Sequence, residues 1–152
     1  ICRALRELAR RNEDIEIVYP VHLNPNVQGP VYEILAGQRR VHLIPPLEYG
    51  DFVHLMATSY LILTDSGGIQ EEAPALGKPV LVMREVTERP EAVLAGTVKL
   101  VGTDTDAIIA NTELLLTDQE EYSRMSQTIS PYGDGKAAER IVQILLSRLD
   151  AP

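Results

Sequence analysis

The chain has 152 residues, of which 45% are apolar and 24% charged, proportions typical of one globular domain. The net charge is −8 and the basic runs are no longer than pairs, so the sequence lacks the cationic surface that a nucleic-acid partner requires. No apolar run approaches the roughly 18 residues of a membrane span, and we expect no membrane partner. The single cysteine, Cys2, excludes an internal disulfide and predicts a reducing, cytoplasmic environment.

The chain begins inside a helical pattern over residues 1–10. Its apolar face carries Ile1, Leu5, Leu8 and Ala9. Since no helix-start signal precedes Ile1, we expect a chain cut at its N-terminus, with this helix packed on a sheet. Short β-branched runs then alternate with segments of helical length. They predict strands at 15–19, 41–44, 60–64, 80–83 and 98–101. They predict further helices at 26–36, 48–58, 68–76, 88–95, 104–116, 118–127 and 136–149.

Three of these helix starts carry a recognisable signal. Thr103 with Asp106 resembles a capping box, and Thr117 with Glu120 resembles another. Pro90 fits a first helical turn, where its missing N–H costs little.

Two other helices have features of their own. Pro74 predicts that helix 68–76 is kinked or shortened. The last helix, 136–149, is strongly amphipathic.

None of the strand segments alternates cleanly between apolar and polar residues, which is typical of strands buried on both faces. Strands that alternate with helices over short connections predict an α/β fold: a Rossmann-like parallel sheet with helices on both faces. Such sheets bind ligands at the carboxyl ends of their strands. The stretch Asp65-Ser66-Gly67-Gly68 lies at such an end, where a strand gives way to a helix.

The residue types of this turn suit a nucleotide. Free backbone N–H groups at a helix start favour a phosphate, and glycines at 67 and 68 let its oxygens approach closely. Glu72 follows Gly68 by one helical turn, where a carboxylate accepts hydrogen bonds from a ribose diol. The stretch is neither a GxGxxG motif nor a P-loop, so a glycine-rich turn beside a surface glutamate remains the alternative.

The sequence also contains three longer stretches: YPVHLNPNV, LILTDSGGIQEEAPALGKPVLVMREVTERPEAVLAGTVKLVG and PYGDGKAAERI. Together they resemble the carboxyl-terminal lobe of bacterial non-hydrolysing UDP-N-acetylglucosamine 2-epimerases, over residues 1–146. The resemblance implies one lobe of a two-lobed GT-B-type fold, with the active site in the cleft between lobes. Residues 1–152 would then be the carboxyl-terminal UDP-binding lobe, truncated at its N-terminus and without the amino-terminal lobe.

The resemblance also assigns roles by position. Ser66, Gly67 and Gly68 would bind the diphosphate, and Glu72 the ribose hydroxyls. Phe52 would pack on uracil, Leu47 would contact the uracil edge largely through its backbone, and Arg89 would reach the nucleotide from a helix start. His22 falls near the cleft, close to the nucleotide or to an allosteric nucleotide sugar. The segment from Tyr132 to Gly135 would serve as a hinge or a ligand contact.

Simpler interpretations stand beside these roles. Phe52, the only phenylalanine, would otherwise be a core residue of helix 48–58. Arg89 would be a surface residue paired with Glu88 or Glu85. His22 would be a hydrogen-bonded loop residue.

The reaction implied by the resemblance interconverts UDP-GlcNAc and UDP-ManNAc. The C2 proton is removed, UDP leaves C1 to give a glycal, and UDP adds again while the opposite face of C2 is protonated. The family's acid and base groups come from the amino-terminal lobe, so we expect no catalytic residue, cofactor or metal in this chain, and no turnover by it alone. For the full-length enzyme we expect a homodimer with a role in polysaccharide biosynthesis.

Two other classes were weighed against this one. A GT-B glycosyltransferase lobe would also carry a glycine-rich turn and a ribose glutamate, but the long unbroken matching block favours the epimerase. A receiver-type module would use Asp65 as an acceptor carboxylate. Such modules carry a second acidic cluster after the first strand, where this chain reads YPVH.

Overall fold

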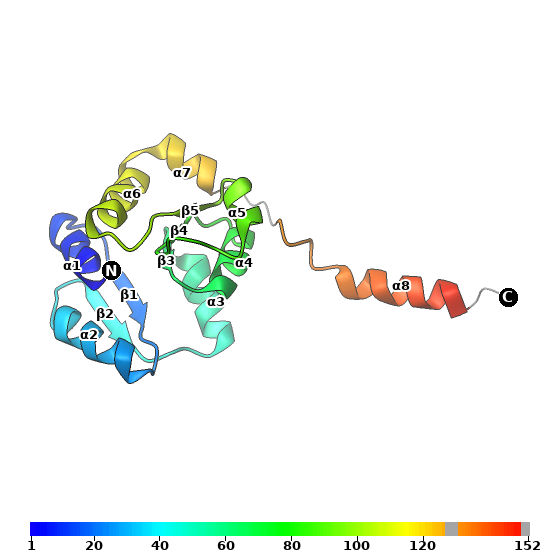
Figure 1. Cartoon of the computed structure of the whole chain (residues 1–152), viewed down its shortest axis with the longest axis horizontal. Helices are drawn as coiled ribbons and strands as arrows, with labels where there is room; N and C mark the ends of the chain where they lie inside the picture. Colours follow the sequence, from blue (N-terminus) through cyan, green and yellow to red (C-terminus); the bar gives the residue numbers. More distant parts are fainter. Residues whose placement is uncertain (127–130, 150–152) are drawn as a thin grey trace.

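The computed structural model describes residues 1–126 and 131–149 (Figure 1). The strands are β1 (Ile17–Pro20), β2 (Val41–Ile44), β3 (Ile62–Thr64), β4 (Val80–Val82) and β5 (Val98–Leu100). The helices are α1 (Cys2–Arg11), α2 (Pro25–Leu35), α3 (Tyr49–Thr58), α4 (Gly67–Ala75), α5 (Pro90–Leu94), α6 (Thr105–Thr117), α7 (Gln119–Met125) and α8 (Ala137–Leu149). Every expected element is present, although residue 127 of the expected helix 118–127 lies outside the described residues. None of the described helices is long and apolar enough to cross a bilayer.

All strand pairs are parallel, as the alternating pattern predicts. β1 pairs with β2, and β4 lies between β3 and β5 in a second ladder. Within the described residues, hydrogen bonding therefore divides the strands into a pair and a group of three, where the sequence pattern suggested one sheet. Side-chain packing connects the two groups, because Leu63 of β3 packs against the cores on both sides of this boundary.

Helices cover both faces of the central strand. Successive side chains of a strand point to opposite faces. Leu81 of β4 belongs to a core cluster shared with α1 and α6, whereas Val80 and Val82 belong to a cluster shared with α3, α4 and α5. All three side chains are fully buried, which explains why this strand shows no polar alternation.

Helix α1 occupies the position expected for the N-terminal pattern. It packs beside α2 and α6, and its Leu8 lies in the same core cluster as Leu81 of β4. Figure 1 shows α1 and α6 as neighbours on one side of the strands. The first segment of the chain is therefore part of the folded core.

The expected capping boxes are wrong by one residue at two helix starts. The N-cap of α6 is Asp104, whose side chain accepts a hydrogen bond from a backbone N–H of the first turn. The N-cap of α7 is Asp118, which accepts two such bonds. An aspartate carboxylate is a charged acceptor and interacts with the helix dipole, so it displaces the neighbouring Thr103 and Thr117 from the cap position.

The two proline predictions agree with the structure. Pro90 begins α5, and α4 ends at Ala75, directly after Pro74. Pro74 is fully buried in spite of its place near the end of the helix. The proline therefore limits the length of α4 while contributing to its packing.

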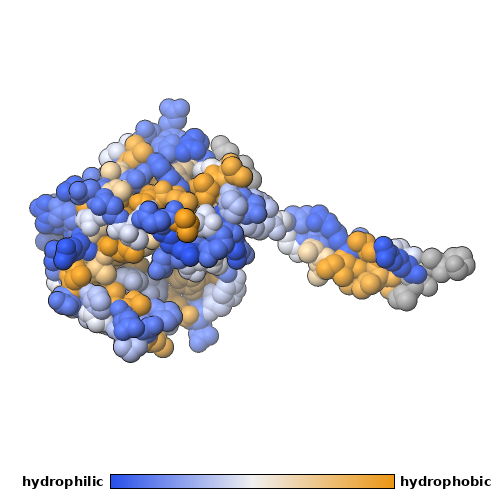
Figure 2. Space-filling model, in the orientation of Figure 1, coloured by the Kyte–Doolittle hydropathy of each residue, from blue (hydrophilic) through white to orange (hydrophobic). Residues whose placement is uncertain are grey.

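Helix α8 extends away from the rest of the molecule (Figure 1). Its apolar side chains form a continuous patch in Figure 2, and each is more than half exposed. They are Ile141, Val142, Ile144, Leu145 and Leu146. The predicted amphipathic helix is thus present, and no other described element covers its apolar face.

Candidate functional site

The Ser66–Gly68 turn joins β3 to α4 at the carboxyl end of the strand. The backbone N–H of Ser66 donates to Oγ1 of Thr64 at 3.0 Å, which fixes the exit from the strand. Ser66 is the N-cap of α4 with an extended backbone, but its hydroxyl makes no capping hydrogen bond. The first N–H groups of a helix have no acceptor within the helix. The turn therefore presents the amides of Gly67 and Gly68 and the positive end of the helix dipole at this edge.

Neither glycine of the turn is required by the fold itself. Both have negative φ, unlike Gly102, whose φ of +68° favours glycine on conformational grounds. A Cβ built on Gly67 would meet no atom within 4 Å, and one built on Gly68 would lie 3.9 Å from the Ser66 hydroxyl. At Gly102 the same atom would lie 2.9 Å from the Glu85 carboxylate. The surface above Gly67 and Gly68 is thus bare although backbone and packing would both accept side chains.

Glu72 lies one turn further along α4. It is half-buried, and its carboxylate makes no hydrogen bond or ion pair with the residues that the structure describes. An unpaired carboxylate on the same helix as the bare turn keeps its acceptor capacity for an outside donor.

Phe52 and Leu47 come from the segment that follows β2. Phe52 lies on α3, is half-buried, and packs against the core cluster that contains Met56 and Ala73. The core interpretation of Phe52 therefore holds for part of its ring, while the rest stays accessible. Leu47 lies in the loop just before α3 and is also half-buried. Ala73 of α4 belongs to the same core cluster, so Phe52 and the helix that carries the turn share one core.

Arg89 lies at the N-cap of α5, as expected for a residue at a helix start. Its partner is Glu71 of α4, to which its Nε donates a hydrogen bond that raises the pKa of Arg89. The alternative interpretation of Arg89, as a surface residue paired with Glu88 or Glu85, is therefore wrong about the partner. Glu88 accepts two hydrogen bonds from Arg84, at 2.8 and 3.1 Å. Glu85 accepts a hydrogen bond from the backbone N–H of Thr103. The Arg89 guanidinium is therefore tied to the helix that carries the turn.

Sequence patterns gave no indication of a role for Gln70. Its side chain is fully buried on α4, where its Nε2 donates to the Ser66 carbonyl at 3.2 Å and its Oε1 accepts from Thr87 at 2.5 Å. The only available signal was a glutamine at i+4 from the N-cap, which is common on exposed helix faces as well. Gln70 connects the turn to the loop that carries Arg89.

His22 lies in the exposed loop after β1. Its Nδ1 accepts a hydrogen bond from the backbone N–H of Asn24 at 3.1 Å. That bond agrees with the interpretation of His22 as a hydrogen-bonded loop residue. No contact within the described residues joins His22 to the Ser66–Gly68 turn.

The segment before α8 has the conformation of a sharp bend. Gly133 and Gly135 both have positive φ, at 121° and 76°. Asp134 between them accepts from the Lys136 backbone and from Arg140, which lowers its pKa and anchors the start of α8.

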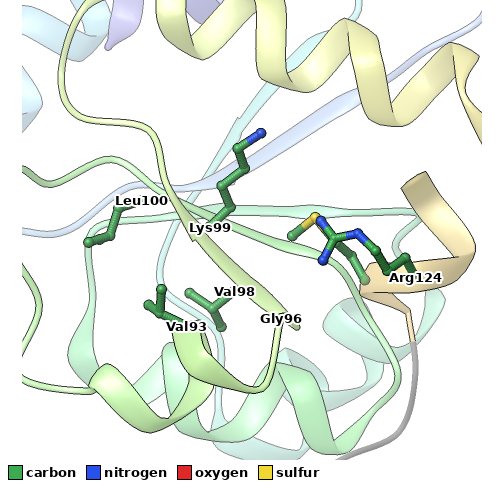
Figure 3. Close-up of a pocket in the computed structure, with 7 residues that line it drawn as sticks. Val93, Gly96, Val98, Lys99, Leu100 and Arg124 are labelled. Atoms are coloured by element: carbon green, nitrogen blue, oxygen red, sulfur yellow. The ribbon is translucent and has the colours of Figure 1, made fainter.

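A separate pocket of about 320 Å³ opens between β5, α5 and α7. Figure 3 shows Lys99 of β5 and Arg124 of α7 at this pocket, with Val93 and Val98 forming its apolar wall. Arg124 is held by a two-bond pair with Glu121. None of the predicted site residues lines it, so the candidate site is the open edge around α4 and not this pocket.

Comparison with known proteins gives a consistent family. The family whose sequence profile matches residues 1–146 is described as UDP-N-acetylglucosamine 2-epimerase. The UDP-N-acetylglucosamine 2-epimerase of Campylobacter jejuni is 60% identical over 146 residues, which make up 96% of this chain and 38% of that protein. The enzyme of the same name from Escherichia coli strain K12 is 61% identical over 145 residues, 95% of this chain and 39% of that protein.

Solved structures agree with the sequence comparison. UDP-GlcNAc 2-epimerase from Neisseria meningitidis, bound to UDP-GlcNAc, superposes with a TM-score of 0.92 at 52% identity, over 97% of this chain and 40% of that one. The chain thus spans about two fifths of the length of the relatives it matches. The likeness confirms the predicted parallel α/β fold.

Proposed function

Because this chain belongs to the UDP-N-acetylglucosamine 2-epimerase family, we propose that it is the carboxyl-terminal lobe of such an enzyme and holds the UDP part of a nucleotide sugar. The lobe assignment is supported by the length of the chain, which leaves about three fifths of each relative to form the rest of the molecule. The match over 146 residues also favours an epimerase over a GT-B glycosyltransferase.

Each predicted site residue then has a chemical role. The amides of Gly67 and Gly68, with the Ser66 hydroxyl, donate to the diphosphate oxygens at the positive end of the α4 dipole. Glu72 accepts from the ribose hydroxyls, and Arg89 supplies positive charge to the nucleotide. Phe52 offers the exposed part of its ring to uracil.

The remaining two predicted site residues are Leu47 and His22. Leu47 borders the uracil through its backbone, and His22 lies toward the cleft. His22 lies in the loop that precedes α2, and Leu47 lies in the loop that precedes α3.

The full-length enzyme would interconvert UDP-GlcNAc and UDP-ManNAc by epimerisation at C2. A base removes the C2 proton as the C1–O bond to UDP breaks, giving a glycal and free UDP. UDP then adds to C1 while an acid protonates the opposite face of C2. Departure of the diphosphate is assisted by preorganised positive charge and N–H donors, which is the contribution of this lobe. The acid and base belong to the other lobe, and the whole enzyme is a homodimer.

One observation carries this proposal. Gly67 and Gly68 are bare although the backbone and the space above them would accept a side chain. A close-approaching diphosphate explains this, whereas a tight turn would require positive φ or a crowded Cβ.

The test is Gly68→Val, measured by NMR titration of the chain with UDP. The added side chain occupies the diphosphate position, so UDP binding is expected to be lost. The free energy of unfolding should change by no more than about 1 kcal/mol, because the residue keeps a helical φ.

Gly29→Val is the control, since Gly29 is likewise an exposed helical glycine, and a Cβ built on it would meet no atom within 4 Å. It should leave UDP affinity unchanged. A folded Gly68→Val chain that binds UDP like the wild type would refute the diphosphate site.

A further inference from the structure

A closed ring of hydrogen bonds connects the turn to Arg89. Gln70 donates to the Ser66 carbonyl at 3.2 Å and accepts from Oγ1 of Thr87 at 2.5 Å. Thr87 Oγ1 in turn accepts from the backbone N–H of Arg89 at 3.0 Å, and Arg89 returns to α4 through Glu71. The ring leaves α4 at Gln70 and rejoins it at Glu71.

The ring fixes the loop between β4 and α5 against the first turns of α4. Residues 83–89 form the loop between β4 and α5, and their backbone is not part of a helix or a strand. The amide of Gln70 is completely buried and both of its ends are used, so it has one stable arrangement. The conformation at Arg89, with φ −123° and ψ 60°, lies outside the helical and strand regions and depends on such external contacts.

From this geometry we infer that Gln70 and Thr87 are positioning residues, which hold the Arg89 guanidinium and the Ser66–Gly68 turn in register for one diphosphate. The inference rests on the proposed function, because it takes the diphosphate as the ligand. Neither residue touches the ligand. Gln70 orients the carbonyl side of the turn, and Thr87 orients the backbone from which the Arg89 side chain extends.

The experiment uses Thr87, since a buried Gln70 variant would also disturb the core. Thr87→Val has nearly the same shape but no hydroxyl, so it removes both the donor to Gln70 and the acceptor for the Arg89 N–H. Thr87→Ser keeps the hydroxyl and is the matched control. Each chain is titrated with UDP and with uridine by NMR, and its stability is measured by urea denaturation.

Thr87→Val is expected to weaken UDP binding about threefold to tenfold, as for the loss of one or two hydrogen bonds that set the geometry of a charged group. Uridine has no diphosphate, so Thr87→Val should bind uridine with unchanged affinity. The control Thr87→Ser should bind UDP like the wild type. A purely structural role would instead weaken both ligands together, in proportion to lost stability.

The outcomes separate this inference from the proposal on which it rests. If the wild-type chain shows no saturable UDP binding, the proposed function fails and the inference fails with it. If the wild type binds UDP and Thr87→Val binds it equally well, or loses uridine to the same extent, only the positioning role is overturned.

Discussion

At the scale of single residues, the candidate site contains groups that have no partner among the residues that the structure describes. The Glu72 carboxylate has no hydrogen-bond donor among the described residues, whereas its neighbour Glu71 is engaged with Arg89. Two adjacent carboxylates on one helix therefore differ in their contacts. Glu71 belongs to the support of the site, and Glu72 is available to a ligand.

This difference gives a direct prediction for Glu72→Ala. UDP binding by the chain should weaken by about 1–3 kcal/mol, the range for hydrogen bonds to a charged group. The same substitution should weaken 2′-deoxy-UDP less, because one of the two ribose donors is already absent. NMR titration with both nucleotides measures the difference, and an equal loss for the two would mean that Glu72 does not bind the ribose.

At the scale of elements, α1 combines a buried apolar face with a charged outer face. Glu7 accepts hydrogen bonds from both Arg10 and Arg11, and these bonds lower the pKa of Glu7 to about 2 from an ordinary value of 4.5. A carboxyl with a lowered pKa in the folded state stabilises that state at pH values above its ordinary pKa.

We therefore expect Glu7→Gln to be less stable than the wild type at neutral pH, by a small amount because the group is at the surface. The difference should persist down to about pH 4.5 and vanish as pH falls towards 2, where wild-type Glu7 is protonated too. Urea denaturation at several pH values tests this. A difference that grows on acidification would contradict the pairing, and added salt should reduce it at every pH.

Helix α8 is an element whose apolar face is covered by none of the other described elements. A contiguous exposed apolar patch favours association. The chain should therefore associate as its concentration rises, and Leu145→Asp should suppress this, since Leu145 lies within the patch and is 56% exposed. Gln143→Asp adds the same charge on the polar side of α8 and should associate like the wild type. Sedimentation analysis distinguishes these outcomes, and a wild-type chain that stays monomeric throughout would contradict the prediction.

At the scale of the whole molecule, the candidate site is an open edge. Its supporting contacts run between α4, α5 and the loop before α5, and the pocket beside Lys99 and Arg124 lies elsewhere. An open edge binds a ligand from one side and leaves the other side to water, which suits half of a cleft better than a complete active site.

The chain alone should therefore not epimerise its substrate. We expect no exchange of the C2 proton when UDP-GlcNAc is incubated with the chain in deuterated water and followed by NMR. The full-length Campylobacter jejuni relative serves as the positive control under the same conditions. Exchange catalysed by the chain itself would place an acid or base among its own residues and refute the assignment of these groups to the other lobe.

Much of this architecture follows from local sequence. Strands such as β4 are recognisable in the sequence, because a strand that is buried on both faces consists of an uninterrupted run of apolar residues. The turn at Ser66–Gly68 is recognisable for a similar reason, since glycine is the one residue that leaves a helix start uncovered. Element order and parallel pairing both derive from these local features.

Tertiary structure decided the contacts between segments. Whether Arg89 pairs with Glu88 nearby or with Glu71 on another helix depends on how closely α4 and α5 approach, which no local pattern encodes. The burial of Gln70 and its link to Thr87 have the same origin. The N-cap of α6 is Asp104 and not Thr103, because the charged carboxylate is the stronger of two adjacent acceptors. The sequence by itself thus determined which elements form and in which order, and only the packing of those elements decided which side chains hold the Ser66–Gly68 turn in place.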